Sequence, residues 1–157
     1  MKKFFFDCGT RDSTASFGFL ALRVLVGLMM LVGHGIPKIQ NYAARKDSFF
    51  VPDFFPLSYL TPPMSLGLCI AAEVGAAALI IIGLATRPAA FVLGLAMVVA
   101  AFGAMGPQPW FQPTPTLVAT KELAVMYLIP MIAIILSGAG AYSLDAAIYR
   151  ETKRRRW

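Results

Sequence analysis

Residues 64–105 read MSLGLCIAAEVGAAALIIIGLATRPAAFVLGLAMVVAAFGAM, and this stretch decides the fold class. Its only charged residues are Glu73 and Arg87, and a short turn around Arg87 divides it into two apolar halves. A helix needs about 20 mostly apolar residues to cross the hydrocarbon core of a bilayer, and each half is close to that length. The stretch therefore predicts two transmembrane helices joined by a tight turn, at residues 64–85 and 88–105.

Two further apolar segments of similar length flank this pair, at residues 16–39 and 117–138. The whole chain is 58% hydrophobic and 14% charged, whereas soluble domains carry about 25% charged residues. Backbone groups in lipid must find hydrogen-bond partners within their own segment, which favours helices over strands. We therefore expect an all-α membrane protein, a bundle of four transmembrane helices that forms one domain over residues 1–157.

The basic residues predict how this bundle is oriented. The net charge is +6, and most Lys and Arg residues lie before the first segment, at Arg87, or after the last segment. These positions share one side of a four-helix path, and cytoplasmic loops carry an excess of Lys and Arg. We expect both termini in the cytoplasm, a basic tail that binds anionic lipid, and no nucleic-acid partner. The first apolar segment is too long for a typical cleaved signal peptide.

The two loops on the opposite side, residues 40–63 and 106–116, are rich in aromatic residues and proline. Such segments favour the membrane interface, so the longer loop is interpreted either as an interface anchor or as a lid over a pocket. On the helix that follows it, Gly67, Ala71 and Gly75 recur every four residues and predict a face for close packing against another helix.

Ionisable residues within the predicted spans are the candidate functional residues. A charge at mid-helix costs about 2.5–3.5 kcal/mol on insertion scales, so such groups usually have a partner or a role. They serve either to lock helices together or to line a pocket for a proton-coupled or redox-active ligand. The candidate pocket residues are Arg23, His34, Lys38, Glu73, Lys121 and Glu122.

Counting residues from the ends of the spans places Arg23 and Glu73 at similar depths in the membrane, about one helical turn apart. An unpaired charge in lipid is costly. We therefore expect these two side chains to pair, directly or through one polar group, and to form the floor of an outward-facing pocket.

The number and position of the cysteine and histidine residues limit which cofactors the chain can bind. Cys8 and Cys69 fall on opposite sides of the bilayer centre, so an intrachain disulfide is not expected. The chain has one histidine, His34, which cannot supply the two axial ligands of a typical b-type haem. We expect no haem or metal, a quinone-like molecule remains a candidate ligand, and no catalytic residue can be assigned.

Several short motifs occur along the chain in a distinctive order. In the first helix they are Leu22-Arg23-Val24 and the GHGIPK string at residues 33–38. The remaining motifs are Glu73, GLATR at residues 83–87, Lys121-Glu122 and GAGAYSLD at residues 138–145. Together these motifs resemble the DoxX family of small bacterial membrane proteins.

This resemblance implies a four-helix protein of the bacterial inner membrane, related to the DoxD-type subunit of thiosulfate:quinone oxidoreductase. It implies a redox-associated subunit in which Arg23, His34, Glu73 and Glu122 line a pocket for a quinone-like or small hydrophobic ligand. Its partners would be membrane lipids and a soluble or membrane-bound redox protein, and a homo-oligomer is compatible with it. The alternative is a non-enzymatic binding or assembly protein for a lipid, a small molecule or a partner subunit. Whether the chain is an enzyme stays open.

Overall fold

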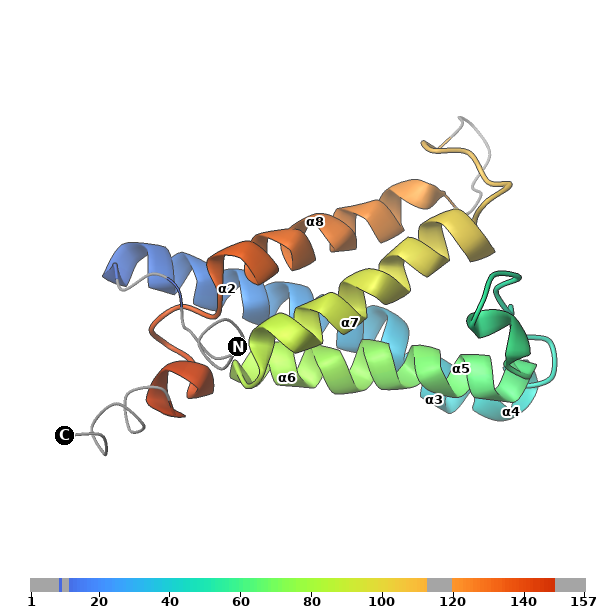
Figure 1. The fold of residues 1–157 in the computed structure, drawn as a ribbon, viewed down its shortest axis with the longest axis horizontal. Helices are drawn as coiled ribbons and strands as arrows, with labels where there is room; N and C mark the ends of the chain where they lie inside the picture. The colour runs from blue at the N-terminus through green and yellow to red at the C-terminus, as the bar shows by residue number, and fades with distance from the viewer. Residues whose placement is uncertain (1–8, 10–11, 113–119, 149–157) are drawn as a thin grey trace.

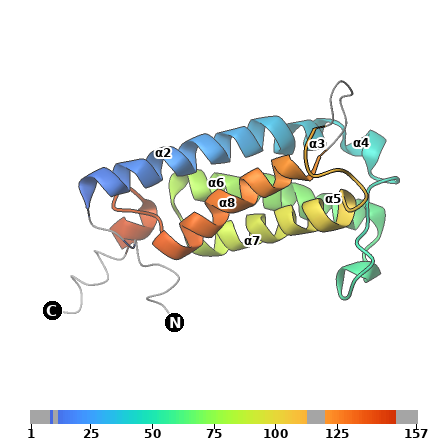
Figure 2. The same ribbon diagram turned by 90° about the horizontal axis from the view of Figure 1, so that it is seen from above.

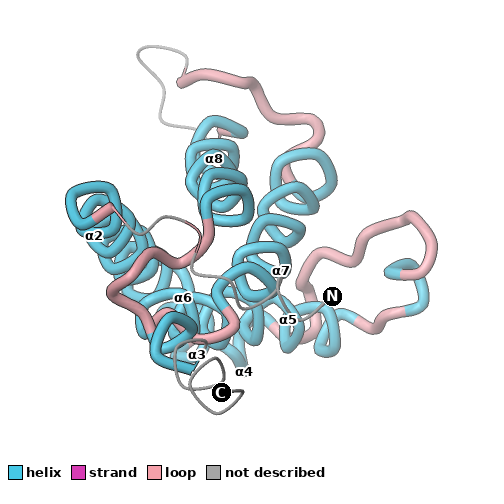
Figure 3. The backbone as a smooth tube through the Cα atoms, turned by 60° about the vertical axis from the view of Figure 1, so that its left-hand side comes forward, coloured by secondary structure: helices cyan, strands magenta, loops and turns pink. Residues whose placement is uncertain are grey.

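The computed structural model describes residues 9, 12–112 and 120–148, and these residues form helices and loops without a β-strand. The long helices run roughly side by side and form a bundle with two distinct ends (Figures 1 and 2). One end holds the turn at residues 83–85 and is called the turn end. The other holds the loop at residues 41–61 and is called the loop end. Figure 3 shows the same helices as cyan tubes seen obliquely along the bundle.

The first long helix runs from the turn end to the loop end over Ser13–Gln40, 28 residues without a break. Asp12 caps its start by accepting a hydrogen bond from the backbone N–H of Ala15, at 2.7 Å. Its consecutive parts are α2 (Ser13–Met30), the π-helical turn η1 (Leu31–Gly35) and α3 (Ile36–Gln40). After it, the loop end carries the short helices α4 (Tyr42–Arg45) and η2 (Leu57–Tyr59).

The second long helix returns to the turn end over Pro62–Ile82, and the third leads back over Thr86–Ala104. Gly83 ends the second helix in the left-handed conformation, with a φ of 73°. The second helix consists of α5 (Pro62–Ile70), the π-helical turn η3 (Ala71–Ala76) and α6 (Ala77–Ile82). The third consists of α7 (Thr86–Val98) and the π-helical turn η4 (Val99–Ala104).

The fourth long helix, α8 (Lys121–Ser137), has 17 residues and contains Pro130. It packs along α7 and touches α2, while α2 packs on α6, so the four long helices surround one core. Small side chains on α7 contribute to this packing, since Ala89 is almost fully buried and Ala90 is fully buried. The core consists of Met30, Ala76, Ala77, Ile80, Ala89, Ala90, Leu93, Met97, Ala101, Ala124, Tyr127, Met131 and Ile134.

Three of these long helices are long and apolar enough to cross a membrane, namely those at Ser13–Gln40, Pro62–Ile82 and Thr86–Ala104. They confirm the first three predicted spans, with ends that shift by up to three residues. The second span ends at Ile82 rather than at residue 85, because Gly83 already turns the chain. The fourth predicted span, 117–138, corresponds to α8, although residues 117–119 lie outside the described part.

The outer surface of the bundle is apolar along each long helix, as a lipid-facing surface requires. On α8 the exposed apolar side chains recur every three or four residues, which is one face of a helix. Contiguous apolar surface of this extent marks an interaction with a membrane or a partner. The exposed large apolar side chains on α8 are Leu123, Met126, Ile129, Ile132 and Leu136.

The small-residue stripe on the second helix does not pack as the sequence predicted. Ala71 and Gly75 are exposed, and a Cβ added at Gly67 or Gly75 would meet nothing within 4 Å. The close approaches involve other glycines: a Cβ on Gly27 would lie 2.5 Å from Ile81, and one on Gly35 would lie 2.6 Å from Val74. The first two helices therefore meet through glycines of the first helix, while the stripe faces away from the bundle.

Candidate functional site

A buried ion pair joins the first two helices near the loop end. Lys38, on α3, reaches Glu73, on η3, with its ammonium nitrogen 2.7 Å from Oε1 and 2.5 Å from Oε2. The side chain of Glu73 is 5% exposed and that of Lys38 is 16% exposed. Burying two charges is costly unless each has a close partner, so this short contact is what allows a carboxylate to lie inside the bundle.

Three further polar side chains surround this pair. The Cys69 thiol donates to Glu73 Oε1 at 3.4 Å. His34 packs edge-on against Tyr127, with ring centroids 5.4 Å apart and an interplanar angle of 89°. His34 lies in η1, which contacts η3, the segment that holds Glu73. We call these five residues, Lys38, Glu73, Cys69, His34 and Tyr127, the polar cluster; they come from the first, second and fourth long helices.

The π-helical turns place these residues. His34 lies in η1 and Glu73 in η3, and these two segments contact each other across the helix pair. A π-turn adds a residue to a helical turn and occurs often at functional sites, because it changes the direction of the side chains that follow. Gly35 lets the two segments approach, since a Cβ there would meet Val74.

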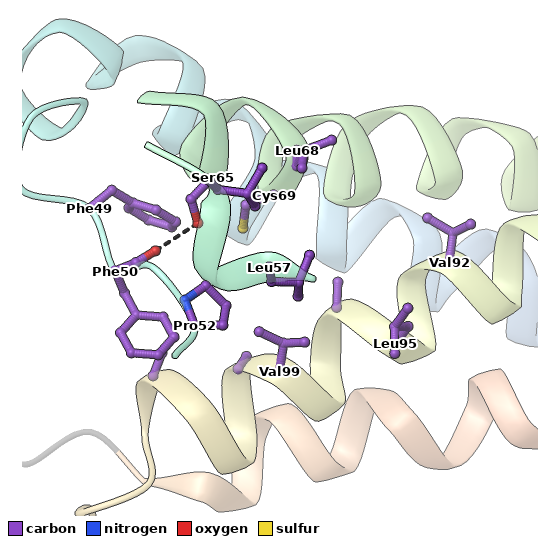
Figure 4. Close-up of a pocket in the computed structure, with 14 residues that line it drawn as sticks. Phe49, Phe50, Pro52, Leu57, Ser65, Leu68, Cys69, Val92, Leu95 and Val99 are labelled. Atoms are coloured by element: carbon purple, nitrogen blue, oxygen red, sulfur yellow. Dashed lines mark hydrogen bonds between the residues drawn. The ribbon is translucent and has the colours of Figure 1, made fainter. Parts of the chain in front are cut away.

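An apolar cavity of about 300 Å³ lies beside the polar cluster, between α5, the third helix and the loop that covers them. Figure 4 shows Phe49, Leu57 and Pro52 reaching over the space between α5 and α7. The Ser65 hydroxyl donates to the Phe50 carbonyl at 2.7 Å and ties this loop to α5. The lining residues are Phe49, Phe50, Pro52, Leu57, Leu60, Ser65, Leu68, Cys69, Val92, Leu95, Ala96, Val99, Ala100 and Ala104.

This arrangement bears on the two interpretations of the long loop. Phe49 and Phe50 line the cavity, which fits a lid, whereas Phe54, Phe55 and Tyr59 are exposed, which fits an anchor at the interface. One loop thus provides both surfaces. Cys69 is the residue that the cavity and the polar cluster share, because its thiol lines the cavity and also donates to Glu73.

Arg23 lies at the turn end and does not pair with Glu73. Its Nη1 donates to the Ile80 carbonyl at 3.2 Å and its Nη2 donates to the Tyr142 carbonyl at 2.7 Å. The guanidinium is fully buried, and the nearby Asp145 carboxylate attracts it. The predicted direct Arg23–Glu73 pair is therefore wrong, since Glu73 binds Lys38 instead.

The direction of the side chains explains this correction. Side chains lean toward the N-terminus of their own helix, and the first two helices run in opposite directions. Arg23 therefore leans toward the turn end while Glu73 leans toward the loop end, so the two side chains point away from each other. Lys38 leans back from the loop end, toward Glu73. Counting residues along the helices estimates the depth of each Cα atom in the membrane. It does not include the opposite directions in which the two side chains lean.

The remaining candidates, Lys121 and Glu122, begin α8 at the loop end. The Lys121 ammonium lies 5.2 Å from the centroid of the Trp110 ring, and Glu122 is exposed. Of the six candidate residues, the structure thus brings together His34, Lys38 and Glu73, and places Arg23, Lys121 and Glu122 elsewhere. None of the six lines the cavity described above. Their role in binding a ligand stays a prediction.

Three residues that contact or lie near the candidate residues were not identified from the sequence. Tyr127 resembled an ordinary core residue, and nothing in its surroundings in the sequence pointed to His34. Cys69 was considered only as a disulfide partner, although its position four residues before Glu73 places both on one helix face. Asp145 was noted only as part of a motif, yet it is 1% exposed, and a carboxylate in a short Gly-rich segment was a detectable signal.

A comparison with known families assigns the chain to one of them. A model of the DoxX family matches residues 18–106, which is more than half of the chain. This chain belongs to the DoxX family. The match contains Lys38, Glu73, Cys69 and the loop over the cavity, whereas Tyr127 and Asp145 follow it. No curated protein and no solved structure matched the chain.

Proposed function

We propose that this DoxX-family chain crosses the bacterial inner membrane four times, with α8 as the fourth span and the turn end in the cytoplasm. A 17-residue helix is about 26 Å long, close to the hydrocarbon thickness of about 30 Å. The exposed apolar face of α8 supports this proposal, and so does the position of Arg87 beside the turn.

Cysteine labelling tests this orientation. In a chain without Cys8 and Cys69, the Asp53→Cys variant should react with a membrane-impermeant maleimide in intact cells with a permeabilised outer membrane. The Ala147→Cys variant should react only after the inner membrane is opened, because residue 147 is exposed at the turn end. Labelling of the Ala147→Cys variant from outside would reverse the proposed orientation.

We further propose that the protein binds a small apolar ligand in the 300 Å³ cavity, and this cavity is the observation that carries the proposal. Ligand sites are concave, mostly apolar and supplied with a few polar groups, and cavities of about 300–1,000 Å³ are typical. Here the apolar walls come from α5, α7 and the loop, while the polar end is the Cys69 thiol. A quinone-like molecule is the first candidate, which would make the chain a redox-associated subunit.

The alternative is a non-enzymatic binding or assembly protein that uses the same cavity for a lipid or another small molecule. The chemical identity of the bound molecule decides between the two. A molecule that accepts and releases electrons reversibly supports a redox role, and a lipid or other redox-inert molecule supports the alternative.

The test identifies small molecules that copurify with the protein. Mass spectrometry of the protein purified in mild detergent should reveal an apolar molecule in roughly stoichiometric amount. The Ala96→Phe variant, which fills the cavity, should lose at least about 90% of it, since a large side chain replaces the space the ligand needs. The matched control is Ala78→Phe, on the exposed face of α6, which should keep the molecule. Equal amounts in all three proteins would contradict a site in this cavity.

A further inference from the structure

We propose that the cavity takes apolar α,β-unsaturated carbonyl compounds and that Cys69 adds to them covalently, with Glu73 accepting the thiol proton. This inference rests on the proposed binding site and names the chemical class of its ligand. Two separate observations carry it: an apolar cavity large enough for a small molecule, and a thiol on its wall that contacts the carboxylate of an ion pair lying behind the wall.

The cavity lining determines which group meets the ligand. Only Ser65 and Cys69 among the lining residues have a polar side-chain atom that could meet it. The Ser65 hydroxyl already donates to the Phe50 carbonyl. The Cys69 sulfur points from α5 into the space between α5 and α7 (Figure 4). A planar apolar ligand between these helices therefore meets one nucleophile, the thiol.

The polar cluster supplies the base that the thiol needs. A thiol reacts as the thiolate, which forms poorly in an apolar environment unless a neighbour removes the proton and stabilises the charge. Glu73 Oε1 lies 3.4 Å from the Cys69 sulfur and already accepts from it. Moving the proton from Cys69 to Glu73 leaves the net charge of the site unchanged, because one anion replaces another. The Lys38 ammonium, which binds the Glu73 carboxylate, attracts either anion.

The reaction balances without an oxidant or a reductant. The thiol proton moves to the Glu73 carboxylate, the sulfur forms a bond to the β-carbon of the ligand, and the carbon–carbon π bond breaks to give an enolate. The enolate then recovers a proton at its α-carbon from Glu73. The product is a saturated thioether, and Glu73 returns to its ionised, Lys38-paired form.

The experiment measures the rate at which N-phenylmaleimide modifies Cys69 in membranes, in a Cys8→Ser chain so that one thiol remains. Mass spectrometry follows the adduct. The matched control carries Cys69→Ala with Ala71→Cys, two residues along the same helix on its exposed face, where no carboxylate contact is described. We expect Cys69 to react roughly 100-fold faster than the control thiol, the low end of what general base catalysis contributes.

Glu73→Gln should lower the rate at Cys69 by a similar factor and leave the rate of the control thiol unchanged. Equal rates at the two thiols, or an unchanged rate in a folded Glu73→Gln protein, would refute the role of Glu73 and the proposal. If Glu73→Gln does not fold, the comparison between Cys69 and the control decides alone.

A further measurement separates this inference from the proposed binding site. N-phenylsuccinimide has the shape of the probe but no reactive double bond, so it should slow the modification of Cys69 by occupying the cavity. It should have no such effect on the control thiol. Protection by the succinimide with a slow maleimide reaction means that the cavity binds and the thiol does not add. Absence of protection, together with equal rates, contradicts both proposals.

Discussion

Replacing Lys38 by Met is expected to destabilise the folded protein by about 3–5 kcal/mol, because the Glu73 carboxylate then stays buried without its partner. The ammonium group provides both of the short contacts that Glu73 makes to a cation. Glu73 lies on η3, packed against η1 and α7, and its side chain is 5% exposed. It therefore has little contact with solvent, so without the Lys38 ammonium its charge stays buried and unpaired.

The reverse substitution should be milder. In Glu73→Gln the amide oxygen still accepts from Lys38, and the long Lys38 side chain lies near the loop end, where it can extend its charged head toward water. We expect a loss of about 1–2 kcal/mol, the cost of weakening one buried hydrogen-bonded pair. The double variant Lys38→Met with Glu73→Gln should lose less than the sum of the two single losses, since neither charge is stranded.

Denaturation of the purified proteins in detergent micelles measures these differences. The matched control is Arg45→Met, which removes a positive charge from an exposed position at the loop end and should change stability by less than about 0.5 kcal/mol. A Lys38→Met protein as stable as this control would show that Glu73 does not depend on the ion pair. Equal losses for the two single variants would contradict the asymmetry argued from burial.

Replacing Asp145 by Ala should have the second large effect, a loss of about 3–5 kcal/mol, because it removes a cap and a buried counter-charge together. Its carboxylate accepts from the backbone N–H of Ala85 at 2.8 Å and from that of Thr86 at 2.9 Å. It also accepts from the Thr86 hydroxyl at 2.8 Å. These bonds hold the start of α7, where a negative charge also complements the helix dipole.

The same carboxylate lies near Arg23, too far away for a direct ion pair but close enough to attract its charge. Arg23 is fully buried, donates to two backbone carbonyls and is attracted by Asp145. A Cβ on Gly83 would collide with the Arg23 guanidinium and lie 2.6 Å from the Cβ of Ser143, so the glycine makes room for this contact. The segment after α8 is thus held against the turn by Asp145, and Arg23 fills the space between them.

Two variants separate the roles of Asp145. Asp145→Asn keeps a hydrogen-bond acceptor but removes the charge, so it should lose roughly half as much stability as Asp145→Ala. Adding Arg23→Met to Asp145→Asn should recover part of that loss, because the unbalanced cation is gone. Asp12→Asn, at the exposed cap of α2, serves as the control and should cost no more than about 1 kcal/mol. If Asp145→Ala is no worse than Asp12→Asn, the cap and the counter-charge contribute little.

The sequence by itself determined the helical class, the first three spans and the family. These properties follow from local composition. Apolar runs of about 20 residues must form helices in lipid, and Gly83 and Pro88 favour a turn between two of these helices. It also singled out Lys38, Glu73, Arg23 and His34, because a charge within such a run is rare and needs a partner wherever it lies.

Only the tertiary structure decided which partner each charge has. Pairing depends on the register between antiparallel helices and on the direction in which side chains lean. It also depends on the π-turns η1 and η3, which change the direction of the side chains they carry. The amino-acid composition contains no information on any of these. Glu73 therefore meets Lys38, and Arg23 meets the segment around Asp145, more than a hundred residues later in the chain. The cavity could not be predicted from the sequence for the same reason. Phe49, Cys69 and Val99 form one surface only after the loop folds over two packed helices.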